Sequence, residues 1–235
     1  MAGLISGDGK NSSGYYAGLA PGAKIIGLKV LDSTGTGYTS TVIQAIDFAV
    51  ANKSSLGVDI INLSLGHPVY ESAATDPLVQ SVQNAVQAGI VVVVAAGNYG
   101  VNPTTGQVGY AGISSPGNAS AAITVGAVNT QDTAARGDDV IPSYSSRGPT
   151  WYDGYAKPDI VAPGHRLVSV AALKSSLYAE YPDFRVSWTG NSSKYFRLSG
   201  TSMATAVTSG AVALMIQANR LAYTAPRRRT RSRRS

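Results

Sequence analysis

The sequence predicts an α/β domain built on a doubly wound, mostly parallel sheet with helices on both faces. Strand-like and helix-like segments alternate along the 235 residues, and no internal repeat interrupts them. Residues 90–94 form a β-branched run, which is typical of a strand buried on both faces of a parallel sheet. Hydrophobic residues make up 44% of the chain and charged residues only 14%, a balance that favours one well-packed core.

The first half of the domain contains one βα unit and the start of a second. Residues 25–31 are apolar and β-prone, which predicts a strand, and residues 58–64 predict another. Between them, residues 39–52 predict a helix, because their apolar side chains recur at helical spacing: Val42, Ile43, Ile46, Ala49 and Val50.

The second helix of the predicted domain has clear boundaries. Asp76 and Pro77 suit the N-cap and first helical position, and Gly89 is a plausible C-cap. One face of this helix is apolar, and the chain then enters the strand at residues 90–94. The face consists of Leu78, Val79, Val82 and Val86.

The second half of the domain begins with a short predicted strand at residues 122–128. A loop-rich region of Gly, Ser and Pro follows. Residues 201–220 are dominated by small and apolar side chains, which predicts a central helix with neighbours on several sides. The domain is expected to span residues 1–220.

The net charge of +6 is concentrated at one end of the chain. Six arginines lie within residues 227–234, so the rest of the chain is neutral. We expect residues 221–235 to form a basic, disordered tail. Such a run could contact phosphates, but it has no aromatic side chain for base stacking, so a nucleic-acid partner is not favoured.

Composition excludes several other classes. The longest apolar stretch, residues 88–96, is far shorter than the roughly 18 residues of a membrane span, so no membrane partner is expected. Residues 1–5 lack the pattern of a secretion signal, and localisation stays open. The absence of cysteine excludes disulfides and a thiol nucleophile.

Two polar side chains stand where acyl-transfer chemistry could occur. Ser202 lies at the start of the predicted last helix, where free backbone N–H groups favour a developing negative charge. Asn98 follows the strand at residues 90–94, at the carboxyl end where open α/β sheets bind ligands. Taken singly, each has a structural alternative: Ser202 as a helix cap and Asn98 as a turn residue.

Several ordered motifs resemble the subtilisin-like serine peptidase family over residues 1–220. Residues 200–204, Gly-Thr-Ser-Met-Ala, resemble the nucleophile motif, and residues 95–98, Ala-Ala-Gly-Asn, resemble the oxyanion loop. Residues 62–66 resemble the substrate-binding strand, and residues 144–149 and 157–164 are similar to segments that the family places before its serine.

The resemblance implies a role for each matched side chain. Ser202 would be the nucleophile, and Asn98 would hold the oxyanion together with the Ser202 backbone N–H. One wall of the substrate cleft would come from Ser64, Leu65 and Gly66, and the other from Ala95, Ala96 and Gly97. The family often binds calcium, but no ligand loop can be matched here, so we predict no metal and no cofactor.

The chain departs from the family's pattern at its N-terminal side. The aspartate and histidine motifs have no match, which indicates an N-terminally truncated domain with an incomplete triad. Only His67 and His165 could replace the base. The family's N-terminal central strand would also be missing, leaving a slot for a second copy, a complementary N-terminal fragment or a rearrangement.

The predicted function is acyl transfer on peptide or ester substrates by a serine hydrolase. Ester hydrolysis is favoured over proteolysis, because an alkoxide leaves with less acid assistance than an amine. The alternative is a catalytically inactive fragment that acts as a binding or assembly module.

Overall fold

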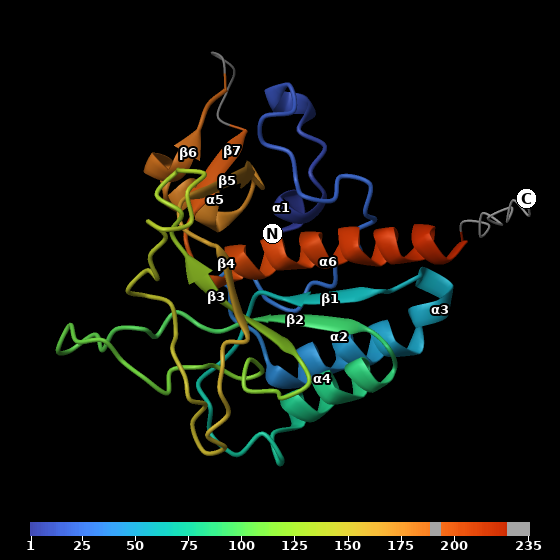
Figure 1. Ribbon diagram of the computed structural model, residues 1–235, viewed down its shortest axis with the longest axis vertical. Coiled ribbons are helices and arrows are strands. Elements are labelled where there is room, and N and C mark those ends of the chain that lie inside the picture. Colours follow the sequence, from blue (N-terminus) through green and yellow to red (C-terminus); the bar gives the residue numbers. More distant parts are fainter. Residues whose placement is uncertain (189–193, 225–235) are drawn as a thin grey trace, which may run out of the picture.

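A computed structural model describes residues 1–188 and 194–224 (Figure 1). A parallel sheet of four strands lies at its centre, in the order β1 (Ile60–Leu63), β2 (Val91–Ala95), β3 (Ile123–Val128) and β4 (Ile160–Pro163). Helix α6 (Thr201–Thr224) covers one face, and α2 (Thr39–Ala51) and α4 (Pro77–Gln87) cover the other. The predicted α/β fold class, with its parallel sheet between helix layers, is confirmed.

The core is divided by the sheet into two layers. On the α2 and α4 side, Val79, Val82 and Val94 are fully buried. On the α6 side, Val93 and Val125 pack against Ala204. The run at residues 90–94 therefore serves both layers, as its β-branched composition predicts.

Helix α4 begins and ends close to the predicted positions. The Asp76 carboxylate accepts hydrogen bonds from the Leu78 and Val79 N–H groups at 2.8 and 3.3 Å. At the other end Ala88 is the C-cap, and Gly89 follows it with a φ of +79°. Gly89 thus takes the left-handed position just beyond the C-cap, where glycine is favoured, rather than the C-cap itself.

The strand predicted at residues 25–31 is wrong. These residues lie outside every helix and strand of the described chain, and Ile25, Ile26 and Leu28 are 46%, 47% and 41% exposed. A β-prone segment becomes a strand only beside a partner, and none of the described strands lies along this one.

A small second sheet was not predicted. It is antiparallel and has the order β5 (Leu167–Val170), β7 (Tyr195–Leu198) and β6 (Arg185–Val186). The remaining described elements are short: α1 (Ala2–Ser6), η1 (Lys10–Ser12), α3 (Lys53–Leu56), α5 (Ser176–Glu180) and η2 (Pro182–Phe184).

Helix α6 is longer than predicted. It continues through Thr224, so its last turn includes residues expected in the basic tail, and residues 225–235 lie outside the described part of the chain. Within the described residues it is the single helix long and apolar enough to cross a membrane, over Thr201–Tyr223, and 44% of its most apolar 18-residue window is buried. Its contacts with all four strands of the parallel sheet account for this apolar character as that of a core helix.

Candidate active site

Ser202 lies in the first turn of α6, at the carboxyl edge of the parallel sheet. Its hydroxyl donates to the Ser64 carbonyl oxygen at 3.2 Å, and the Ser64 hydroxyl donates back to the Ser202 carbonyl oxygen at 3.0 Å. Ser64 directly follows β1, so this reciprocal pair fixes the start of α6 against the end of β1. Within the described chain the Ser202 N–H has no hydrogen-bond acceptor, as is usual in the first turn of a helix.

Asn98 follows β2 and contacts the same helix start. Its Oδ1 accepts from the Thr201 N–H at 3.0 Å and from the Thr201 hydroxyl at 3.1 Å. A backbone N–H can only donate, so the atom facing Thr201 must be the oxygen, and the orientation of the amide follows. The Asn98 Nδ2 lies beside Gly200, where an added Cβ would stand 3.4 Å from it, and it donates to no atom of the described chain.

Two unused donors therefore flank the Ser202 turn: the Asn98 Nδ2 and the Ser202 N–H. They come from the loop that follows β2 and from α6, and the contacts of Thr201 hold this loop to the helix. Donors that are fixed before the reaction cost no reorganisation when negative charge develops. This is the arrangement expected of an oxyanion hole.

The Asn98 loop is supported from beneath by small residues. Gly97 has a φ of +105°, and an added Cβ would lie 2.9 Å from the Ser146 hydroxyl and 3.0 Å from the Ser114 hydroxyl. The Ser146 hydroxyl also accepts from the Tyr99 N–H at 3.0 Å, and the Ser146 N–H donates to the Gly97 carbonyl at 3.0 Å. The loop thus requires glycine at position 97 and is braced on the far side by Ser146.

The Ser202 loop is supported by the segment that follows β4. The Gly200 N–H donates to the Gly164 carbonyl at 2.8 Å, and the Tyr144 hydroxyl donates to the same carbonyl at 3.0 Å. Burial raises the pKa of Tyr144 above its ordinary value of 10.0, although hydrogen bonds involving Gly200 and Ser199 oppose this. Residues 144–149 and 157–164, singled out from the sequence, therefore brace the two loops of the site.

Neither histidine of the chain hydrogen-bonds to Ser202. The His67 Nδ1 lies 2.7 Å from the Pro68 carbonyl, and its ring stacks on Tyr70. His165 is half-buried and stacks on Tyr144. The Ser202 hydroxyl is instead bonded to a carbonyl, which can accept its hydrogen bond but cannot act as a general base near neutral pH.

The two predicted walls of the substrate cleft are both hydrogen-bonded to the segment that contains Ser114 and Ser115. The Ser115 carbonyl accepts from the His67 N–H, next to Gly66, at 2.9 Å, and the Ser114 N–H donates to the Ala96 carbonyl at 3.0 Å. Leu65 packs against the core layer of α2 and α4. Ala95 and Ala96 are also buried, so the side chains of these three residues are occupied by packing.

Comparisons with known proteins agree with this geometry. The family model described as "Subtilase family" matches residues 1–230. The chain belongs to the subtilase family. It is 41% identical to serine protease AprX of Bacillus subtilis over 93% of this chain and 48% of that protein. It is 36% identical to subtilisin E of the same organism over 88% of this chain and 42% of that protein.

Solved structures give the same result for the fold. A cold-adapted subtilisin-like serine proteinase superposes with a TM-score of 0.63 at 29% identity, covering 93% of this chain and 60% of that one. Sphericase superposes with a TM-score of 0.68 at 29% identity, covering 93% and 62%. The chain thus spans about half the length of the curated relatives named above, which are serine proteases by name or subtilisins.

Sequence reasoning assigned no role to three supporting residues of this subtilase site. Thr201 orients the Asn98 amide, and Ser146 braces the Asn98 loop. Ser114 lies between the two predicted walls. Thr201 and Ser146 lie in segments that resemble the family's motifs, and threonine at a helix start often bonds to nearby backbone or side chains. Ser114 lies in no such segment.

Proposed function

We propose that this chain is a serine hydrolase in which Ser202 attacks ester carbonyl groups, and that it hydrolyses activated esters better than peptide bonds. The observation that carries the proposal is the pair of unused donors, the Asn98 Nδ2 and the Ser202 N–H, next to a serine hydroxyl with no histidine partner. This combination supports stabilisation of an oxyanion without efficient proton transfer.

The chemistry follows from those two properties. The Ser202 Oγ forms a bond to the ester carbonyl carbon, and its proton passes to water. The negative charge on the carbonyl oxygen is stabilised by the two donors, and the bond to the leaving oxygen then breaks. Water attacks the resulting acyl-serine and releases the acid. An alkoxide or phenoxide can leave unprotonated, whereas an amine requires a proton from a general acid.

Comparison of two substrates and three proteins tests this proposal. p-Nitrophenyl butyrate and a peptide p-nitroanilide should be incubated with the unaltered chain, with Ser202→Ala and with Ser199→Ala. Ser199 lies in the same loop, where its hydroxyl accepts from the Arg166 N–H, so it is a matched control. We expect ester turnover by the unaltered chain and by Ser199→Ala, a fall of at least about 100-fold in Ser202→Ala, and no measurable anilide cleavage.

Two outcomes would contradict the proposal. Ester hydrolysis that persists in Ser202→Ala would mean that another group reacts. Anilide cleavage as fast as ester cleavage would mean that an acid and base are in place, and the ester preference would be wrong.

A second candidate function, a binding or assembly module, is supported by a different observation. A large apolar pocket opens beside β1, on the edge of the sheet that no described strand covers.

A further inference from the structure

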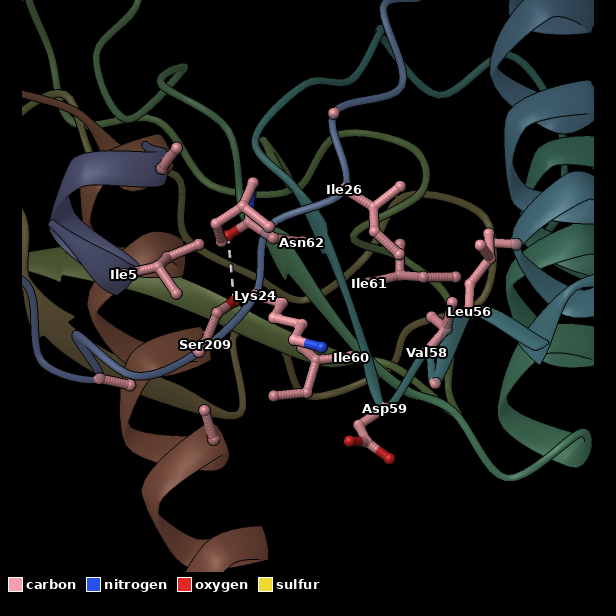
Figure 2. A pocket seen from close by; sticks show the side chains of 18 of the residues that line it. Ile5, Lys24, Ile26, Leu56, Val58, Asp59, Ile60, Ile61, Asn62 and Ser209 are labelled. Carbon is pink, nitrogen blue, oxygen red and sulfur yellow. Dashed lines mark hydrogen bonds between the residues drawn. The ribbon is translucent and has the colours of Figure 1, made fainter. Parts of the chain in front are cut away.

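A series of side-chain hydrogen bonds links the Ser202 turn to the middle of α6. The Ser209 hydroxyl donates to the Asn62 Oδ1 at 3.0 Å, and the Asn62 Nδ2 donates to the Ser64 hydroxyl at 2.9 Å. The Ser64 hydroxyl in turn donates to the Ser202 carbonyl at 3.0 Å. Figure 2 shows the first of these bonds, between Asn62 of β1 and Ser209 of α6. We call these four residues the Asn62 network.

The positions of the four residues follow from the geometry of α6 and β1. Ser202 and Ser209 are seven residues apart, which is about two helical turns, so they lie on the same face of α6. Asn62 and Ser64 are two residues apart at the end of β1, so their side chains leave the same face of the strand. Because α6 packs against β1, the two pairs of polar side chains meet.

The Ser202 carbonyl determines the direction of every bond in the Asn62 network. A carbonyl can only accept, so the Ser64 hydroxyl must direct its one proton at it. The Ser64 oxygen is then available to Asn62 only as an acceptor, so the atom that faces it must be the Asn62 Nδ2. This leaves the Asn62 Oδ1 for Ser209, whose hydroxyl has to donate. The orientation of the Asn62 amide is therefore fixed from both ends.

The hydroxyl of Ser209 bonds to β1 rather than to its own helix. A serine or threonine within a helix often donates to the carbonyl four residues back, as the Thr205 hydroxyl does to the Thr201 carbonyl at 2.8 Å. The Ser209 hydroxyl instead reaches Asn62, although Ser209 is only 1% exposed. Buried polar networks whose members are satisfied are rigid, so this bond holds the Asn62 amide in one orientation.

We propose that Asn62 is a positioning residue, which acts on Ser202 through the Ser64 hydroxyl, and that Ser209 fixes the Asn62 amide. Ser64 holds Ser202 at two points, because its carbonyl also accepts from the Ser202 hydroxyl at 3.2 Å. The residue held in this way supplies both the nucleophile and the N–H donor to the oxyanion. This role of Asn62 rests on the proposed function of Ser202 and adds two residues that lie behind the reacting atoms.

Kinetics of p-nitrophenyl butyrate hydrolysis test the effect on Ser202. Asn62→Ala should lower kcat about tenfold and change KM less than about twofold, because positioning of a nucleophile affects the transition state more than substrate binding. Asn62→Asp keeps the size of the side chain but replaces the donor to Ser64 with an acceptor, so it should be as slow as Asn62→Ala. Ser209→Ala removes one bond to the amide and should lower kcat about threefold.

A double variant shows whether Asn62 and Ser209 act in series. If Ser209 acts only through Asn62, adding Ser209→Ala to Asn62→Ala should lower kcat by less than a further twofold or so. Residues that support the fold independently would instead give losses that multiply.

The matched control for both residues is Thr208→Val. It removes a buried hydroxyl from the neighbouring position of α6, where this hydroxyl has no hydrogen-bond partner among the described residues. Its kcat and KM should stay within about twofold of those of the unaltered chain.

Hydrogen exchange examines the Ser202 turn without requiring turnover. The Ala206 N–H lies four residues after Ser202, so it is the helical partner of the Ser202 carbonyl. In Asn62→Ala and in Ser209→Ala, it should exchange at least about threefold faster relative to the Val82 N–H of α4, which reports opening of the whole fold. In Thr208→Val the ratio of the two rates should not change.

The two measurements separate this proposal from the proposed function. An unaltered chain without ester turnover would contradict the proposed function, and exchange at Ala206 would still decide whether the Asn62 network holds Ser202. An unchanged ratio of exchange rates would overturn the positioning role. In an active chain, so would a kcat of Asn62→Ala within about twofold of the unaltered chain, or losses that multiply in the double variant. A raised KM with unchanged kcat would also overturn it, by assigning Asn62 to substrate binding.

Discussion

The carboxyl end of the sheet and the outer edge of β1 differ in how completely their polar groups are satisfied. At the carboxyl end, hydrogen bonds join Ser64 to Ser202 and Asn98 to Thr201, and the donors left unused are those that an oxyanion would need. At the outer edge of β1, whole rows of backbone groups lack partners in the described chain. A site can therefore be locally preorganised while the sheet that carries it remains open on one side.

The largest expected effect tests the preorganised end. Asn98→Ala removes the Nδ2 donor and the acceptor that holds Thr201, and it should lower kcat for ester hydrolysis by about 10²–10³-fold, or about 2.7–4 kcal/mol. KM should change little if the interaction forms mainly in the transition state. Steady-state kinetics with p-nitrophenyl butyrate measure both constants.

The matched control for that variant is Asn84→Ala, which removes an exposed amide from α4, outside the two loops of the site. Its kcat should stay within about twofold of the unaltered chain, as for most surface changes. An Asn98→Ala enzyme with unaltered kcat would show that Nδ2 is not an oxyanion donor.

The next prediction compares packing in the two regions directly. Val93→Ala removes two methyl groups from a fully buried position of β2 and should lower the free energy of unfolding by about 2–3 kcal/mol. Ile26→Ala removes a larger apolar group from the wall of the apolar pocket beside β1. It should nevertheless lower the free energy of unfolding by less than about 1 kcal/mol, because the Ile26 side chain is 47% exposed.

Urea unfolding followed by circular dichroism measures both differences. Equal losses of unfolding free energy in Val93→Ala and Ile26→Ala would mean that residues 24–31 pack as tightly as β2. The inferred difference between the two regions would then be wrong.

The same contrast explains what could be predicted from the sequence. Strands β1, β2 and β3 and helices α2 and α4 were found, because each has a partner nearby and its apolar pattern matches its surroundings. The strand at residues 25–31 was predicted from the same kind of pattern and is wrong, because strand formation depends on a neighbour that local sequence does not contain. Ser202 and Asn98 could be found from motifs, whereas the bracing by Ser146 arises from contacts between distant segments.

The smallest expected effect concerns Tyr144, which joins the two loops of the site through its bond to the Gly164 carbonyl. Tyr144→Phe should lower the free energy of unfolding by about 0.5–1.5 kcal/mol near neutral pH, the usual net value of one hydrogen bond. The control Tyr38→Phe, at a side chain 80% exposed, should change it by less than about 0.5 kcal/mol.

The pH dependence provides a second test at Tyr144. Burial raises the pKa of this phenol in the folded chain above its ordinary value of 10.0, so the folded state holds the proton more tightly than the unfolded state does. The stabilisation is therefore complete below about pH 10 and is lost as the pH rises through the higher folded-state pKa. The difference in unfolding free energy between the unaltered chain and Tyr144→Phe should thus narrow in urea titrations above about pH 10. A difference that stays constant or widens there would mean that the Tyr144 hydroxyl is solvated, and that its bond to Gly164 does not hold the Ser202 loop in place.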